Sequence, residues 1–245
     1  MNYSPILSIA TATLEIGAAI WALRGPGRRY IIQPTVTILL FLAGYQIVET
    51  VFCTGLLPLT GQLLPRLAFV IVAWLPPTGL LLTARLYPTT SRGFHRYAYA
   101  MYAVCALLVT GILLDRGFVS KSVCMVVFAR YTTPTSLMQF YGFFYQLGLM
   151  SMLLISAFGV TICRDDHQRL LLGQLLFGSI GFIFPALITV SVLPIAENAL
   201  PSILCHFALV LALFLIRLVN IERKQSVTSE VEVALPPDPL KTRMA

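Results

Sequence analysis

The stretch PTVTILLFLAGYQIVETVFC, residues 34–53, is an apolar segment that carries one amide and one carboxylate. A membrane-spanning helix needs about 20 mainly apolar residues, so this segment predicts one span. Gln46 and Glu49 are three positions apart and share a helical face, with Cys53 about one turn further along. A carboxylate at the centre of a span costs roughly 2.5–3.5 kcal/mol on insertion scales, so we expect Glu49 to face a partner or water inside a helix bundle.

The rest of the chain has the same apolar character. Of its 245 residues, 58% are hydrophobic and 11% are charged, whereas about 25% of the residues in a soluble domain are charged. The formal net charge of +7 comes mainly from basic residues in short loops between apolar runs. That distribution is typical of topology signals in membrane proteins and argues against a nucleic-acid partner.

Seven apolar runs are long enough to cross a bilayer, which predicts an all-α, polytopic bundle of seven transmembrane helices. The runs cover residues 5–23, 34–52, 67–86, 97–114, 137–162, 170–193 and 201–219. No lysine or arginine precedes the first run, so it is interpreted as a retained span rather than a cleaved signal peptide. Residues 1–221 are expected to form the transmembrane domain, and the polar residues 222–245 a disordered cytoplasmic tail.

Lysine and arginine are unequally divided between the two sets of loops. Thirteen lie on the side that includes the C-terminal end, and four lie on the opposite side. By the positive-inside rule the side with thirteen is cytoplasmic, which places the N-terminus outside and the C-terminus inside. We therefore expect a multi-pass protein of the plasma or inner membrane.

Polar residues predict a pocket toward the outer end of this bundle. Glu15 lies on a small, polar face of the first span, and His206 lies in the outer third of the last span. If the first, second and last spans are neighbours, these two residues meet Gln46 and Glu49 in one cluster. Ionisable residues inside spans are usually functional, although polar side chains can also pair simply to join two helices.

Two other spans add residues to this pocket. The fifth span contributes Tyr145 and Gln146 as further ligand contacts. The third span contains Trp74, Pro76 and Pro77, and the two prolines predict a break because they remove two backbone donors. Such a break can act as a hinge or widen a cavity, or it can equally be fixed geometry.

The cysteines suggest a covalent link at the outer end. Cys53 ends the second span, and Cys124 lies in the long outer connection. In an oxidising compartment, a disulfide between them would tie that connection over the mouth of the bundle. Cys205 is a competing partner. Residues 119–131 mix β-branched and polar side chains, which predicts a short hairpin that acts as a lid.

Several familiar chemistries lack the residues that they need. No lysine lies in any span, which excludes a retinal Schiff base. His206 with Glu15, Glu49 and Cys53 could offer mixed metal ligands, but their spacing matches no recognised metal pattern. The chain has no phosphate-binding glycine loop and no nucleophile elbow. We therefore expect no catalytic residues, no metal and no cofactor, and the sequence favours a protein that is not an enzyme.

Three stretches, residues 43–49, 66–77 and 202–208, resemble an uncharacterised family of bacterial seven-helix membrane proteins, a domain of unknown function. That resemblance covers most of the chain and implies the seven-helix fold, in a bacterial inner membrane, without a known activity. The third span also resembles, more loosely, the seven-helix sensor region of some membrane histidine kinases.

The sequence favours a sensory or small-ligand-binding bundle with a polar pocket open to the outer side. A ligand or a proton would change the bundle through the break in the third span, and a cytoplasmic signalling partner would detect the change. The alternative is a proton-coupled small-molecule transporter in which the same carboxylates carry protons. Transport predicts polar residues that continue into the inner halves of the spans, and those halves are apolar.

Overall fold

The structure is a computed structural model that describes residues 4–56, 62–87, 92–126, 128–192 and 199–234. Within these ranges the chain forms helices α1 (Ile6–Arg24), α2 (Arg29–Thr54), α3 (Leu63–Ala73), α4 (Leu75–Leu86), α5 (Arg92–Leu114), α6 (Ser136–Ile162), α7 (Asp166–Val192) and α8 (Leu200–Ala234), and strands β1 (Lys121–Cys124) and β2 (Ala129–Thr132). Helices α3 and α4 form one broken span, so seven helical segments are long and apolar enough to cross a membrane. This confirms the predicted helical class and the predicted number of helical segments of spanning length.

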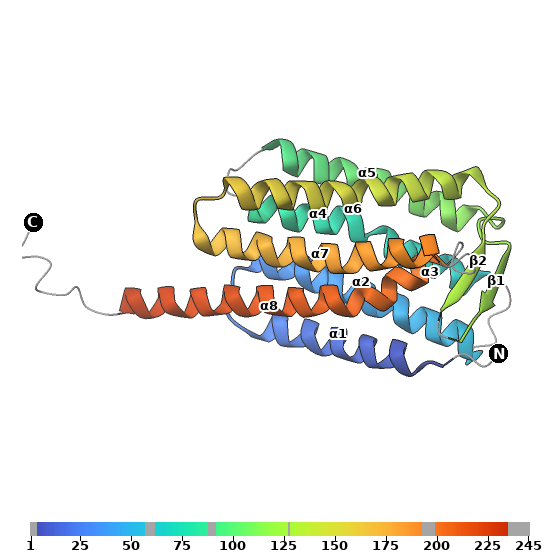
Figure 1. The fold of residues 1–245 in the computed structure, drawn as a ribbon, viewed down its shortest axis with the longest axis horizontal. Coiled ribbons are helices and arrows are strands. Elements are labelled where there is room, and N and C mark those ends of the chain that lie inside the picture. Colours follow the sequence, from blue (N-terminus) through green and yellow to red (C-terminus); the bar gives the residue numbers. More distant parts are fainter. Residues whose placement is uncertain (1–3, 57–61, 88–91, 127, 193–198, 235–245) are drawn as a thin grey trace, which may run out of the picture.

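The helices run side by side along one axis, and the β-hairpin covers one end of the bundle (Figure 1). We call this end, where the N-terminus also lies, the hairpin end. Helix α8 runs past the other helices at the opposite end, which we call the extension end. The broken α3–α4 span has the largest buried share, because it packs against α2, α5, α6 and α7.

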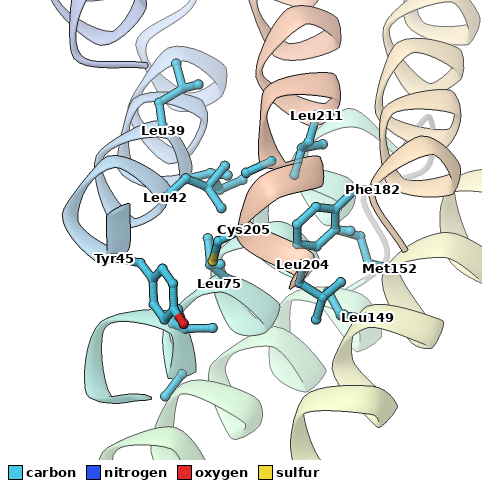
Figure 2. Packing of buried hydrophobic residues seen from close by; sticks show 14 of the residues in the cluster. Leu39, Leu42, Tyr45, Leu75, Leu149, Met152, Phe182, Leu204, Cys205 and Leu211 are labelled. Carbon is cyan, nitrogen blue, oxygen red and sulfur yellow. The ribbon is translucent and has the colours of Figure 1, made fainter. Parts of the chain in front are cut away.

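The core lies where α2, α4, α7 and α8 meet. Leu42 of α2, Leu75 of α4, Phe182 of α7 and Leu211 of α8 are all buried there and point toward one another (Figure 2). Many large apolar side chains are also exposed on the outside of the bundle, along α1, α5, α6 and α7. Such large exposed apolar surface is unusual for a soluble monomer and suits a bundle that faces lipid.

The predicted break in the third span is present at Trp74, between α3 and α4. Pro76 and Pro77 lie in the first turn of α4, where a missing N–H is tolerated. Pro77 leaves the carbonyl of Ala73 without its helical donor, and the Cys105 thiol of α5 contacts that carbonyl at 3.2 Å. Because both prolines are buried and the freed carbonyl is satisfied, these contacts support fixed geometry rather than a hinge.

The hairpin predicted within residues 119–131 is confirmed by the antiparallel pairing of β1 with β2, in which Cys124 lies opposite Ala129. A disulfide joins Cys124 to Cys53 near the end of α2, with their Cα atoms 5.6 Å apart. The backbone N–H of Ala129 also donates a hydrogen bond to Oγ of Ser202 on α8, at 3.0 Å. Cys205, the competing partner, is a buried free thiol. The hairpin is thus fastened to both α2 and α8.

Helix α8 does not end where the sequence predicts the tail to begin. It continues past residue 222 to Ala234. Glu222 itself is 1% exposed and is held by Arg28, just before α2, and by His167 in the first turn of α7. Nε and Nη2 of Arg28 donate to its carboxylate at 2.5 and 2.6 Å, and Nε2 of His167 lies 3.2 Å from Oε2. The hydrogen bond to Glu222 raises the pKa of the Arg28 guanidinium. Residues 235–245 of the predicted tail lie outside the described residues.

Candidate functional site

Three of the predicted site residues are buried where α1, α2 and α8 pack against one another. Glu15 belongs to α1, Gln46 and Glu49 share one face of α2, and each is at most 1% exposed. Nε2 of Gln46 donates a hydrogen bond to the backbone carbonyl of Cys205 on α8, at 2.5 Å. Helices α1 and α2, which carry the two carboxylates, both pack against α8. We call Glu15, Gln46 and Glu49 the carboxylate cluster.

The carboxylate cluster holds acceptors that are not satisfied. Neither carboxylate oxygen of Glu15 has a hydrogen-bond partner in the described part of the chain, and the same holds for Oε1 of Gln46. The amide nitrogen of Gln46 already donates to Cys205. A buried acceptor without a partner costs about 1–3 kcal/mol, and more when it is charged. An occupant of the cluster would therefore have to bring a proton, another donor or a positive charge.

A groove of about 230 Å³ between α1 and α2 borders the cluster. Gln46 lines it together with Ser8 and Thr50, and most of its other walls are aliphatic. The amide of Gln46 is therefore next to open space at the side of the bundle, between the first two helices.

The His206 ring contacts its own helix. This residue follows Cys205 on α8, and its half-buried ring has Nδ1 2.7 Å from the carbonyl oxygen of Ser202, one turn earlier on the same helix. No hydrogen bond joins His206 to Glu15 in the part of the chain that the structure describes. Successive residues of a helix point about 100° apart. The His206 imidazole therefore points in a different direction from the buried Cys205 side chain.

A second cavity, of about 220 Å³, lies between α3, α6, the beginning of α8 and strand β2, next to the hairpin. Aromatic side chains form much of its wall, and we call it the aromatic cavity. The residues that matter for its chemistry are Phe69, Tyr131, Met138, Tyr141, Tyr145 and Gln146.

The aromatic wall is held together by ring contacts between different elements. Phe69 of α3 packs edge-on against Tyr131 of β2 and Tyr141 of α6, with ring centroids 5.2 and 5.5 Å apart. Tyr141 and Tyr145 stack with centroids 5.9 Å apart. Edge-on and offset pairs are the favourable arrangements for aromatic rings, so the cavity keeps its shape through packing.

Two polar side chains border the aromatic cavity from α6. The hydroxyl of Tyr145 is buried and has no hydrogen-bond partner among the described residues. Gln146 is half-buried beside it. Gly142 also lines the cavity, and a Cβ placed on it would meet no atom within 4 Å. The cavity is therefore apolar, with a hydroxyl and an amide on one wall and open space over Gly142.

The single predicted pocket is thus divided into two regions. Gln46 borders the groove between α1 and α2, whereas Tyr145 and Gln146 border the aromatic cavity. Between the two regions, the hydroxyl oxygens of Tyr45 and Tyr131 lie 3.3 Å apart in a buried hydrogen bond. Figure 2 shows Cys205 directed from α8 toward Tyr45.

The sequence alone does not identify Phe69 and Tyr131 as cavity residues. Tyr141 could be inferred, because it is four positions before Tyr145 and therefore lies on the same helical face. Phe69 and Tyr131 come from α3 and β2, and their approach to α6 depends on the break after Ala73 and on how the hairpin folds back. No local pattern predicts either arrangement.

Among the described residues, no group of three or more His, Cys, Asp and Glu side chains is placed to hold a metal ion. The geometry therefore offers an apolar cavity and a buried carboxylate cluster as its two chemical features. No family model, curated protein or solved structure matches this chain.

Proposed function

We propose that the chain is a multi-pass protein of the plasma or inner membrane, with the hairpin end outside and the extension end in the cytoplasm. Seven helical segments of spanning length support insertion. The excess of lysine and arginine at the extension end supports the orientation. The Cys53–Cys124 disulfide at the hairpin end supports it independently, because structural disulfides belong to oxidising compartments.

Within that frame, we propose that the protein is a sensory, small-ligand-binding bundle whose ligand occupies the aromatic cavity. The observation that carries this proposal is an aromatic cavity of about 220 Å³ whose wall includes a buried Tyr145 hydroxyl that has no partner among the described residues. Ligand pockets are typically apolar with a few placed polar groups, and drug-sized ligands occupy roughly 300–1,000 Å³. The ligand is therefore a small, largely apolar molecule with an acceptor or donor for Tyr145 and Gln146.

Helix α8 connects this cavity to the cytoplasmic end. Leu200, Pro201 and Leu204 at its beginning line the aromatic cavity, and the same helix carries Glu222, which is bound to Arg28. A helix of 35 residues is about 50 Å long. A ligand that shifts the beginning of α8 would act on the Arg28–Glu222 contact through one continuous element, where a signalling partner could detect it.

Filling the cavity should abolish ligand binding. We expect Gly142→Phe to fold normally, because open space lies over Gly142, and to place its ring inside the aromatic cavity. The measurement is a thermal-shift screen of the purified protein against small apolar compounds that carry one or two polar atoms. Compounds that raise the unfolding midpoint of the wild type should lose that effect in Gly142→Phe.

The matched control for this variant is Gly173→Phe on α7. A Cβ at Gly173 also meets no atom within 4 Å, and Gly173 does not line the aromatic cavity. Gly173→Phe should respond to the same compounds as the wild type. Compounds that stabilise all three proteins equally would place the ligand elsewhere.

Proton-coupled transport is the second candidate, and one observation favours it. Glu15 is buried with both oxygens lacking a partner among the described residues, and carboxylates inside membrane bundles often serve as proton relays. Transport requires protons to cross the bundle, whereas sensing does not.

Proton flux separates the two functions. Sensing predicts that liposomes containing the wild-type protein acidify no faster than empty liposomes under a pH gradient, with or without compounds found in the screen. Under transport, a flux would appear with the wild type and would be lost in Glu15→Gln, which keeps the shape of the side chain and removes its charge. A flux of that kind would replace the sensing proposal with transport.

A further inference from the structure

A hollow of about 300 Å³ lies between α1 and α8 at the extension end. We call it the basic hollow, and it is lined by Gly17, Ile20, Trp21, Arg24, Gly25 and Arg223. Two guanidinium groups border it, and none of the described acidic side chains does. It follows the groove between α1 and α2 along α1 toward the extension end, and it shares no lining residue with that groove or with the aromatic cavity.

Arg223 is held in place by α1. Its guanidinium carbon lies 3.9 Å from the ring centroid of Trp21, and Nη2 donates a hydrogen bond to the backbone carbonyl of Trp21. The side chain also packs over Gly25, where an added Cβ would collide with the guanidinium. Its Nε–H group is buried and has no hydrogen-bond partner within the described ranges. The group is therefore fixed while part of its donor capacity stays unused.

Arg24 provides a second positive charge without a counter-charge. It lies in the last turn of α1, is exposed, and forms no ion pair with any residue that the structure describes. Arg28, a few residues later, differs because the buried carboxylate of Glu222 already binds it. The same pairing turns Glu222 inward, away from the basic hollow.

The basic hollow continues along α1 as an apolar path. Gly17, Ile20 and Arg24 lie at successive turns on one face, and Gly17 is about 10 Å from Arg24 along the helix. A Cβ on Gly17 would meet no atom within 4 Å. Ile20 and Trp21 are 44% and 38% exposed. The shape is thus a cationic end joined to an apolar groove.

We propose that the basic hollow binds an anionic phospholipid, with its phosphate at Arg24 and Arg223 and an acyl chain along Ile20 to Gly17. Guanidinium groups bind phosphate oxygens with paired N–H donors. Basic pockets between helices on the cytoplasmic side are known to take anionic headgroups. Placement in the inner leaflet depends on the orientation proposed above, whereas the binding itself does not.

Lipid titration of the purified full-length protein in mild detergent tests this site. Phosphatidylglycerol should raise the unfolding midpoint more than phosphatidylcholine does. Arg24→Gln should weaken the apparent affinity for phosphatidylglycerol about fivefold, as expected for one basic residue near a membrane surface. Arg92→Gln is the matched control, because Arg92 is also an exposed arginine at a helix end and lies outside the basic hollow. It should behave like the wild type.

Two further comparisons identify the ligand. Gly17→Leu fills the apolar path without touching either arginine, and it should also weaken the response to phosphatidylglycerol. Glycerol phosphate at matched concentrations should give no stabilisation, because it lacks the acyl chains. Three results would overturn the proposal. The first is an equal loss of phosphatidylglycerol affinity in Arg24→Gln and Arg92→Gln. The others are equal stabilisation by phosphatidylglycerol and phosphatidylcholine, and full stabilisation by glycerol phosphate.

Discussion

Replacing Cys53 and Cys124 together by serine is expected to lower the free energy of unfolding by about 2–4 kcal/mol. The disulfide closes a loop across a separation of 71 residues, and a cross-link over so long a loop removes much entropy from the unfolded chain. A bilayer or micelle already restrains the unfolded chain, which favours the lower half of that range. Denaturant or thermal unfolding in detergent measures the change.

The structure also predicts a consequence for the aromatic cavity. Cys124 lies on β1, and Tyr131 of the paired strand β2 forms part of the cavity wall. Ligands found in the screen should therefore bind the double variant more weakly. Reduction of the wild-type protein should reproduce both effects, which separates loss of the bond from side effects of serine. Unchanged stability after both treatments would show that the hairpin is held by its other contacts alone.

Glu222→Ala is expected to cost about 2–3 kcal/mol of stability. The substitution removes the buried acceptor for Arg28 and the partner of His167, so α8 loses its contacts with the start of α2 and the start of α7. Breaking a fully buried ion pair costs more, but Arg28 is 34% exposed and can still be hydrated. The change should appear as a lower midpoint in thermal unfolding of the purified protein.

Asp166→Asn provides the comparison for Glu222→Ala. Asp166 pairs with Arg169 at 2.6 Å, but both side chains are mostly exposed. Exposed pairs of this kind contribute at most about 1 kcal/mol. Asp166→Asn should therefore change the midpoint only slightly. Similar losses in the two variants would mean that burial of Glu222 adds nothing to the contact.

The spans and the break were predictable because both depend on local sequence. Twenty apolar residues can cross a bilayer whatever their neighbours are, and two adjacent prolines interrupt a helix wherever they occur. The hairpin in residues 119–131 follows from its β-branched composition. The sequence left two possible disulfide partners for Cys53, which were Cys124 and Cys205. One sequence does not show which segment lies over the end of α2.

The site was predictable only in part, since it depends on the rotation and order of helices. Gln46 and Glu49 share a face through their spacing, and Glu15 lies on the polar face of its helix. Cys205 is buried, whereas its neighbour His206 is half-buried and contacts the Ser202 carbonyl, a difference that depends on how α8 is rotated. Glu222 looked like the beginning of a tail, because its partner Arg28 is 194 positions away in the chain.

The most direct test of the account is native mass spectrometry of the protein purified from its own membrane. We predict that the wild type carries one small, largely apolar molecule, that Gly173→Phe carries it too, and that Gly142→Phe does not. A molecule retained equally by Gly142→Phe would contradict the assignment of the aromatic cavity as the ligand site.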